Sequence, residues 1–237
     1  MFGLFEKKVA LTEKQILRGG SDAHSHILFG VDDGVKTAEE SLNILALLEK
    51  EGLRELWLTP HTMEDVPNTG EALKARFEEL CKLYKGSIEL HLASEYMMDE
   101  LFLKHLRDRD LLTHKEQASV LLETSAWSAP YKFWEMLEDT KRAGYRPILA
   151  HPERYEYMDM KDYRRLNSMG IRLQLNYPSL LGYFGENAKK KAERLLKEGM
   201  YSMTGSDCHR MTAIARLLEA REIKEKTAVS LHNLIVK

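Results

Sequence analysis

The sequence predicts an α/β protein whose parallel strands close into a barrel. Short apolar runs of strand length alternate with longer amphipathic runs along the 237 residues. Parallel neighbours need crossover connections, so this alternation favours a mostly parallel sheet. Residues of the types that bind metal ions lie at six of the expected strand ends, always the carboxyl end. Such ends converge on one mouth in a closed barrel, whereas an open sheet would spread them too widely to share a site.

Seven strands are expected within one domain, because no Pro-, Gly- or Ser-rich linker interrupts the chain. The first is inferred from the pair His24 and His26, since Gly19-Gly20-Ser21-Asp22 before it is a poor strand former. In an extended segment alternate residues share a face, so these two imidazoles project together. The other six expected strands are the runs 55–59, 88–93, 119–122, 147–150, 171–175 and 201–204.

Helices are expected between the strands. Thr37-Ala38-Glu39-Glu40 has the capping-box pattern, in which Thr37 accepts from the Glu40 amide and the Glu40 side chain reaches back. An apolar stripe at helical spacing follows, formed by Leu42, Ile44, Leu45 and Leu48. Four glycines fit the left-handed position that ends a helix just before the next strand: Gly52, Gly144, Gly170 and Gly199.

Composition and charge exclude several classes of protein. The formal net charge of −2 gives no electrostatic case for nucleic acid or for an acidic membrane. No apolar run approaches the roughly 20 residues of a transmembrane helix. The two distant cysteines, Cys81 and Cys208, form no disulfide framework and fit a reducing cytoplasm. The first eight residues are too short and too charged for a signal peptide, and Phe2 and Phe5 are expected to pack on the domain.

The side chains at the strand ends predict a centre with several metal ions. His24 and His26 near one end of the chain are matched by Asp207-Cys208-His209 near the other. The predicted ligands are five histidines and four carboxylates: His24, His26, Asp33, His61, Glu95, Glu123, His151, Asp207 and His209. Nine side chains exceed the need of one ion and suit two or three, and the donor mixture fits Zn, Mn or Fe.

Some of these assignments have alternatives. Asp32 competes with Asp33, because one aspartate can coordinate while the other shapes the Asp-Gly turn. Glu95 and Glu123 can instead cap the helices that follow them. We expect structural or surface roles for the four remaining histidines, His91, His105, His114 and His232.

Such a centre suits the hydrolysis of a phosphate ester. Clustered metal ions lower the pKa of bound water and clamp the oxygens of an in-line displacement. Three divalent ions would exceed the charge of four carboxylates by two, which complements a phosphate dianion. Arg154, three residues after His151, is expected to clamp phosphate oxygens, with Arg210 and Arg216 as weaker candidates.

The chain also resembles a known family. The stretch from His24 to Ser41, HSHILFGVDDGVKTAEES, resembles the opening of the polymerase-and-histidinol-phosphatase (PHP) superfamily. It is most similar to the bacterial tyrosine phosphatases of capsule and exopolysaccharide synthesis, of the CpsB and YwqE types. Three ordered motifs support this resemblance, at residues 150–155 (AHPERY), 182–186 (GYFGE) and 205–209 (GSDCH).

The resemblance implies a distorted (β/α)7 TIM-like barrel of the PHP type at residues 21–237, after an N-terminal extension at residues 1–20. It also implies three divalent ions, Mn first and Fe or Zn as alternatives. The first ion would lie on His24, His26, Glu95 and Asp207. Glu95 would bridge to the second ion, held also by Glu123 and His151. The third ion would lie on Asp33, His61 and His209.

The activity implied is a metal-dependent protein-tyrosine phosphatase, in which metal-bound hydroxide attacks phosphorus and Arg154, Asp207 and His209 are catalytic. A carboxylate at Glu123, where other branches have histidine, favours this branch. The implied partner is a phosphotyrosine protein, a tyrosine kinase of polysaccharide synthesis, with oligomerisation left open. Neither cysteine is expected to act as nucleophile, because Ile214 and Ser87 stand where that mechanism needs arginine. The alternatives are a phosphatase of a small phosphomonoester, such as histidinol phosphate, and a non-catalytic docking partner of the kinase.

Overall fold

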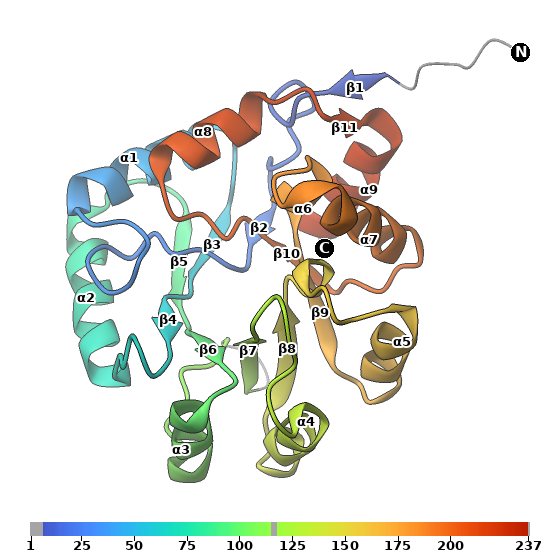
Figure 1. Cartoon of the computed structure of the whole chain (residues 1–237). Helices are drawn as coiled ribbons and strands as arrows, with labels where there is room; N and C mark the ends of the chain where they lie inside the picture. Colours follow the sequence, from blue (N-terminus) through green and yellow to red (C-terminus); the bar gives the residue numbers. More distant parts are fainter. Residues whose placement is uncertain (1–6, 115–117, 237) are drawn as a thin grey trace, which may run out of the picture.

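In the computed structural model, which describes residues 7–114 and 118–236, strands form the centre and helices surround them (Figure 1). One sheet contains three strands in the order β2 (Ser21–Asp22), β3 (Glu55–Leu58) and β5 (Glu89–Leu92). The second has the order β10-β9-β8-β7-β6-β4. Its strands are β4 (His61–Thr62), β6 (Glu95–Met97), β7 (Ser119–Glu123), β8 (Arg146–Ala150), β9 (Arg172–Asn176) and β10 (Met203–Gly205). Every pairing within the two sheets is parallel.

The two sheets are parts of one barrel. Strand β3 continues into β4 across Pro60, and β5 continues into β6, with the Glu95 amide donating to the Pro60 carbonyl at 3.1 Å. At the other edge β10 meets β2, where the Ala23 amide donates to the Thr204 carbonyl at 2.9 Å. The His26 amide then donates to the Cys208 carbonyl, also at 2.9 Å. The barrel class predicted from the sequence is confirmed.

Each of the seven expected strands has a counterpart, but two of them are broken. Proline has no amide hydrogen, so Pro60 interrupts the ladder and the chain resumes as the short strand β4. Strands β4 and β6, which carry His61 and Glu95, were not expected from the sequence. An antiparallel pair outside the barrel, β1 (Lys8–Val9) with β11 (Ile223–Lys224), was not expected either.

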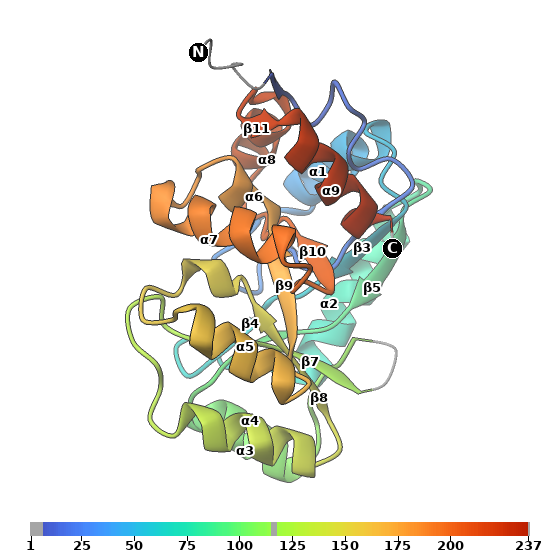
Figure 2. The same ribbon diagram turned by 90° about the vertical axis from the view of Figure 1, so that its right-hand side faces the viewer.

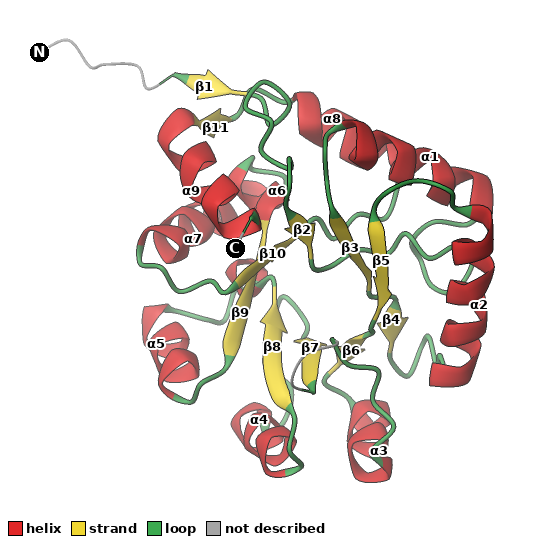
Figure 3. Ribbon diagram, turned by 180° about the vertical axis from the view of Figure 1, so that it is seen from behind, coloured by secondary structure: helices red, strands yellow, loops and turns green. Residues whose placement is uncertain are grey.

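The helices form the outer layer, as the views from the side and from behind show (Figures 2 and 3). They are α1 (Ala38–Lys50), α2 (Gly70–Leu83), α3 (Glu100–Asp108), α4 (Phe133–Arg142), α5 (Met160–Ser168), α6 (Tyr177–Leu180), α7 (Gly185–Lys197), α8 (Met211–Glu219) and α9 (Glu225–Ile235). A single 3-10 turn, η1 (Pro152–Arg154), follows β8. The four glycines predicted to end helices all have positive φ angles.

The capping box predicted at α1 is half right. The Thr37 hydroxyl accepts from the Glu40 amide at 3.2 Å, as expected. The Glu40 carboxylate does not turn back to Thr37. It accepts from the Met211 amide at 3.2 Å and so caps the start of α8, which lies beside α1 (Figure 1). A partner supplied by the tertiary structure has replaced the local one.

The chain before Ser21 packs on the barrel. Val9, Leu11, Ile16 and Leu17 are buried in the same core cluster as residues of α9. The boundary predicted at residue 21 stays a prediction, and Phe2 and Phe5 lie outside the described residues. Within residues 7–114 and 118–236, no helix combines the length and apolar character needed to cross a bilayer.

Candidate metal centre

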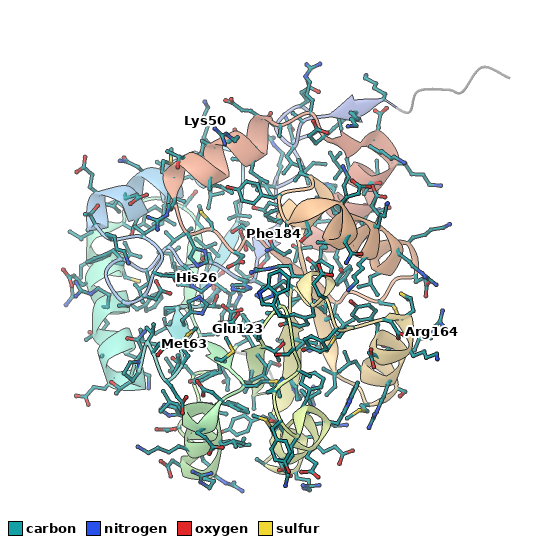
Figure 4. All side chains as sticks on the ribbon, viewed as in Figure 1. His26, Lys50, Met63, Glu123, Arg164 and Phe184 are labelled. Carbon is teal, nitrogen blue, oxygen red and sulfur yellow. The ribbon has the colours of Figure 1, made fainter. Side chains whose placement is uncertain are left out.

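The barrel brings all nine predicted ligands to one mouth. They reach it from the carboxyl ends of strands β2, β7, β8 and β10, from the first residues of β4 and β6, which continue β3 and β5, and from the loop before α1 that carries Asp33. Figure 4 shows His26 and Glu123 near the centre of the face seen in Figure 1. Eight of the nine side chains form three overlapping clusters, and within each cluster the ligand atoms lie within 4.8 Å of one another. The ninth, His151, lies within ion-pair distance of Glu95 and Glu123.

The first cluster contains His24, His26, Glu95 and Asp207. The two imidazole Nε2 atoms lie 3.0 Å apart, and Glu95 Oε2 lies 3.1 Å from that of His24 and 3.2 Å from that of His26. Asp207 Oδ1 is 3.5 and 3.3 Å from the same two nitrogens. Ligands about 2.1 Å from one ion are about 3.0–3.4 Å from each other, so this spacing suits one shared cation.

Glu95 also belongs to the second cluster. Its Oε1 lies 3.0 Å from His151 Nε2, and its Oε2 lies 3.2 Å from His61 Nδ1. Glu123 Oε1 is 3.1 Å from that His61 nitrogen, and Glu123 Oε2 is 3.7 Å from His151 Nε2. Both carboxylate oxygens of Glu95 are therefore directed at imidazoles, which suits a ligand shared between two ions.

The third cluster contains His26, Asp33, His61 and His209. Asp33 Oδ1 lies 3.5 Å from His61 Nε2 and 3.4 Å from His209 Nε2. His61 thus presents one ring nitrogen to the second cluster and the other to the third. The family resemblance assigned it to the third alone.

The structure gives Asp32 and Asp33 different surroundings. Asp32 Oδ2 accepts from His26 Nδ1 at 2.8 Å and from the His61 amide at 3.0 Å. Its Oδ1 accepts from the Gly34 amide at 2.9 Å. Burial alone would raise the pKa of Asp32, but His26 and these amides lower it to about 2. Asp32 therefore orients His26, while Asp33, whose side chain is 70% exposed, faces the cluster.

A second orienting residue was missed from the sequence. Gln174 Oε1 accepts from His24 Nδ1 at 3.0 Å, which leaves His24 Nε2 free to face the cluster. Gln174 is fully buried on β9, inside the otherwise apolar run LQL. A lone buried amide in a central strand was the signal for this role.

The donor set fits divalent cations. In the described part of the chain, Glu95 Oε2, His61 Nδ1 and His151 Nδ1 are buried without a hydrogen-bond partner. Burial alone would raise the pKa of Glu95 and Asp207, yet the imidazoles around them, His24 foremost, hold both pKa values well below their usual range. Buried carboxylates that stay ionised need positive charge nearby, and imidazole with carboxylate suits Mn, Fe or Zn.

Two of the ligand residues have strained backbones. His151 has φ 33° and Asp207 has φ 53°, in the left-handed region that residues with a Cβ rarely adopt. Such strain persists where the surrounding structure holds it, and it gathers at functional sites. Here it turns each side chain into the mouth directly after its strand.

Arg154 lies at the edge of the centre, on η1. Its Nη1 donates to Asp207 Oδ2 at 2.7 Å, and its guanidinium carbon lies 4.4 Å from the centre of the Phe184 ring. A cavity of about 190 Å³ is lined by Arg154 together with eight other residues, seven of them predicted ligands. The adjacent Glu153 points inward and accepts from the Asn176 amide and from the hydroxyls of Ser179 and Tyr201. It thereby anchors the turn beneath Arg154.

The aromatic residues near Arg154 differ in accessibility. Tyr155 is 1% exposed and its hydroxyl accepts from the Thr124 amide, so it belongs to the core. Tyr157 stacks on Tyr155, with ring centres 5.7 Å apart. Phe184 is 37% exposed, and its ring makes a cation–π contact with Arg154.

The remaining histidines and the two cysteines are outside the three clusters. His114 Nε2 donates to the Ala23 carbonyl at 3.0 Å, and His232 Nδ1 donates to the Ile16 carbonyl at 2.9 Å. His91 pairs with Glu55 and Glu89. Cys81 and Cys208 are free, and burial raises the pKa of both thiols, which disfavours the thiolate that a cysteine nucleophile needs.

The chain is similar to the proteins of a known family. The family described as "Capsular polysaccharide synthesis, CpsB/CapC" matches residues 21–230. The tyrosine-protein phosphatase CpsB of Streptococcus pneumoniae is 30% identical over 203 residues, which is 80% of this chain and 83% of that protein. The tyrosine-protein phosphatase YwqE of Bacillus subtilis is 28% identical over 194 residues, or 79% and 76% of the two chains.

The fold has a close counterpart among solved structures. A crystallographic study of YwqE from Bacillus subtilis and CpsB from Streptococcus pneumoniae, described there as unique metal-dependent tyrosine phosphatases, provides a match with a TM-score of 0.76. The match has 24% identity and covers 92% of this chain and 88% of the other. The resemblance predicted from the motifs is confirmed: this chain belongs to the CpsB/CapC family of capsular polysaccharide synthesis.

Proposed function

We propose that this chain is a metal-dependent phosphoric monoester hydrolase that acts on phosphotyrosine in proteins. The observation that carries the proposal is the set of three overlapping ligand clusters, joined through Glu95 and His61, with Arg154 beside them. The tyrosine phosphatases among its relatives support the substrate class. We further propose three divalent ions, Mn first, on the nine residues of these clusters.

The side chains of the site would hold the ions and the phosphate at fixed positions relative to one another. Bound ions would supply charge stabilisation and a water of lowered pKa. Asp207 belongs to the first cluster and also accepts from Arg154, so one carboxylate ties the guanidinium to the metal ligands. Phe184 covers one face of that guanidinium. Only one nitrogen of the Arg154 guanidinium donates to Asp207, so the other N–H groups can donate to phosphate oxygens. Binding these oxygens is the catalytic role that we assign to Arg154.

His209 is the other residue of the site that we propose as essential. Its Nδ1 donates to the Asp207 carbonyl at 2.8 Å, which directs Nε2 toward Asp33. Its side chain is 26% exposed, so it lies at the rim where a substrate enters. Loss of His209 would remove one member of the third cluster, while all four residues of the first cluster would remain.

We infer that the physiological substrate is a tyrosine kinase of polysaccharide synthesis, met in the cytoplasm. Membership of a capsular polysaccharide family supports this choice. The net charge of −2 supports a protein rather than a nucleic acid as the partner.

The test compares phosphotyrosine peptide, phosphoserine peptide and histidinol phosphate, each with added Mn and with chelator. Turnover that is lost with chelator and prefers phosphotyrosine is expected. Arg154→Ala and His209→Ala should each lower kcat/KM by about a hundredfold or more, as removal of one charge-stabilising group does. Turnover of histidinol phosphate alone would assign the site to a small phosphomonoester. Binding of the kinase without any turnover would make the chain a docking partner.

A further inference from the structure

We infer that the pocket beside Arg154 holds the aromatic ring of the phosphotyrosyl side chain, and so selects tyrosine over shorter phosphorylated residues. The inference rests on the proposed function and names a part of the site that neither the motifs nor the ligand clusters assign. The pocket has a volume of about 280 Å³. Small-molecule sites begin at about 300 Å³, so a cavity of this size suits one ring rather than a large ligand.

The pocket and the metal-site cavity share three lining residues, Arg154, Asp207 and His209. The two spaces therefore adjoin at these three residues, and we place the phosphate in the cavity and the ring in the pocket. Arg154 lies between the two spaces, with its Nη1 on Asp207 and the Phe184 ring 4.4 Å from its guanidinium carbon. Figure 4 shows Phe184 on the same face as His26 and Glu123.

The chemistry of the walls changes from one end of this combined space to the other. The metal-site cavity is lined by histidines and carboxylates, with Met63 as its one apolar residue among those described. The pocket adds six apolar or aromatic residues, beside Ser206, Cys208 and Arg210: Pro178, Tyr183, Phe184, Ala213, Ile214 and Leu217. A charged end joined to an apolar end matches a phosphate dianion joined to an aromatic ring. A phosphoserine side chain would leave the apolar end unfilled.

The walls come from two parts of the fold, which makes the pocket rigid on one side and adjustable on the other. Ile214 and Leu217 are buried on α8 and form a fixed floor. Tyr183 and Phe184, between α6 and α7, are 53% and 37% exposed, with ring centres 5.5 Å apart at an interplanar angle of 65°. Exposed aromatic side chains at such an edge suit an edge-to-face contact with an incoming ring.

The test fills the pocket and compares a ligand with a ring to one without. Ala213→Phe adds a ring where a partly buried alanine lines the pocket, and Thr212→Phe adds the same bulk at the exposed neighbouring position of α8, outside it. The measurements are kcat/KM for phosphotyrosine and the inhibition constant of inorganic phosphate. Ala213→Phe should lower kcat/KM about tenfold or more relative to Thr212→Phe, which is the loss expected when an apolar group stays in water. The phosphate inhibition constant should change far less.

A second variant avoids any effect of bulk on folding. Tyr183→Ala, at the exposed rim, should raise KM for phosphotyrosine severalfold, and Tyr183→Phe should restore it, because the ring alone makes the contact. If a pocket variant weakened the binding of phosphotyrosine and of inorganic phosphate equally, the ring assignment would be overturned and the proposed function would stand. The same conclusion would follow if neither Ala213→Phe nor Tyr183→Ala weakened the binding of either ligand. If the unsubstituted protein bound phosphate but did not hydrolyse phosphotyrosine, both the ring assignment and the proposed function would be contradicted.

Discussion

At the scale of single residues, the most informative contact is the one between Asp32 and His26. Asp32 and Asp33 have the same side chain. Asp32 accepts a hydrogen bond from His26 Nδ1, on the side of the ring away from the cluster, whereas Asp33 faces the cluster. The 2.8 Å bond to Asp32 keeps a proton on His26 Nδ1 and directs Nε2 toward the cluster. The arrangement separates a residue that orients a ligand from a residue that can be a ligand.

This separation predicts distinct effects for two isosteric variants. Asp32→Asn should lower the affinity for Mn about 10–100-fold, because an amide fixes the His26 tautomer less firmly than a carboxylate. Asp33→Asn should mainly weaken the most exposed of the ions that bind. Titration calorimetry with Mn on metal-free protein checks both. Identical binding isotherms for the two variants would contradict the assignment.

His114 gives a prediction about pH and stability. It is 7% exposed, and burial lowers its pKa from the ordinary 6.5 to about 4. The unfolded chain therefore binds more protons than the folded one between these values. The free energy of unfolding falls as the pH drops through this window, by up to about 3 kcal/mol from this residue.

The check is denaturant unfolding of metal-free protein between pH 7.5 and 4.5. His114→Gln should be less stable than the parent at pH 7.5, and the difference should shrink as the pH falls. The metal ligands titrate in both proteins, so the difference between the two isolates His114. A difference that stays constant with pH would show that His114 does not titrate in this way.

At the scale of elements, α1 and α8 are linked by a cap between residues far apart in the chain. Glu40 on α1 accepts from the first amide of α8, that of Met211, while Thr37 caps α1 itself. Helix α8 supplies the floor of the pocket beside Arg154. Its N-terminus follows His209 by two positions, so the cap also supports the last ligand segment.

We expect Glu40→Ala to cost about 0.5–2 kcal/mol in the free energy of unfolding, the usual effect of losing an N-terminal cap. Thr37→Ala should cost a similar amount through α1 alone. The two differ in where protection from amide exchange is lost: at α8 for Glu40→Ala and at α1 for Thr37→Ala. Hydrogen exchange by mass spectrometry distinguishes them, and loss at α1 in both variants would disprove the long-range cap.

At the scale of the whole molecule, the predicted ligands come from distant parts of the barrel. They come from six strands and from the loop before α1, including β2 and β10, where the barrel closes. An ion bound at this mouth favours the closed barrel over the unfolded chain by mass action. Metal content and global stability should therefore change together.

Removal of metal should lower the melting temperature. At a Mn concentration about 100 times Kd, each bound ion adds about 2.7 kcal/mol to the free energy of unfolding. Calorimetric melting with Mn and with chelator measures the difference. Glu95→Gln, which changes the residue shared by two clusters, should abolish most of it. Equal melting temperatures of the parent protein in the two buffers would exclude tight binding.

The sequence by itself determined the barrel class, the approximate positions of the seven strands, the helix ends at glycine and the nine candidate ligands. These features are local: apolar periodicity, turn chemistry and the position of a polar residue after an apolar run can each be read within a few residues. The motif at His24–Ser41 was also sufficient to identify the family, which the comparison confirmed.

Only the tertiary structure decided which residues face one another. It separated the roles of Asp32 and Asp33, directed Glu40 to α8 and placed Gln174 behind His24. It also placed the pocket beside Arg154 against the metal-site cavity, with which the pocket shares three lining residues. The bonds of Glu40 and Gln174 join elements that meet only when a helix packs on its neighbour or when β10 closes on β2. Their energies depend on distances between residues far apart in the chain, which no local pattern contains.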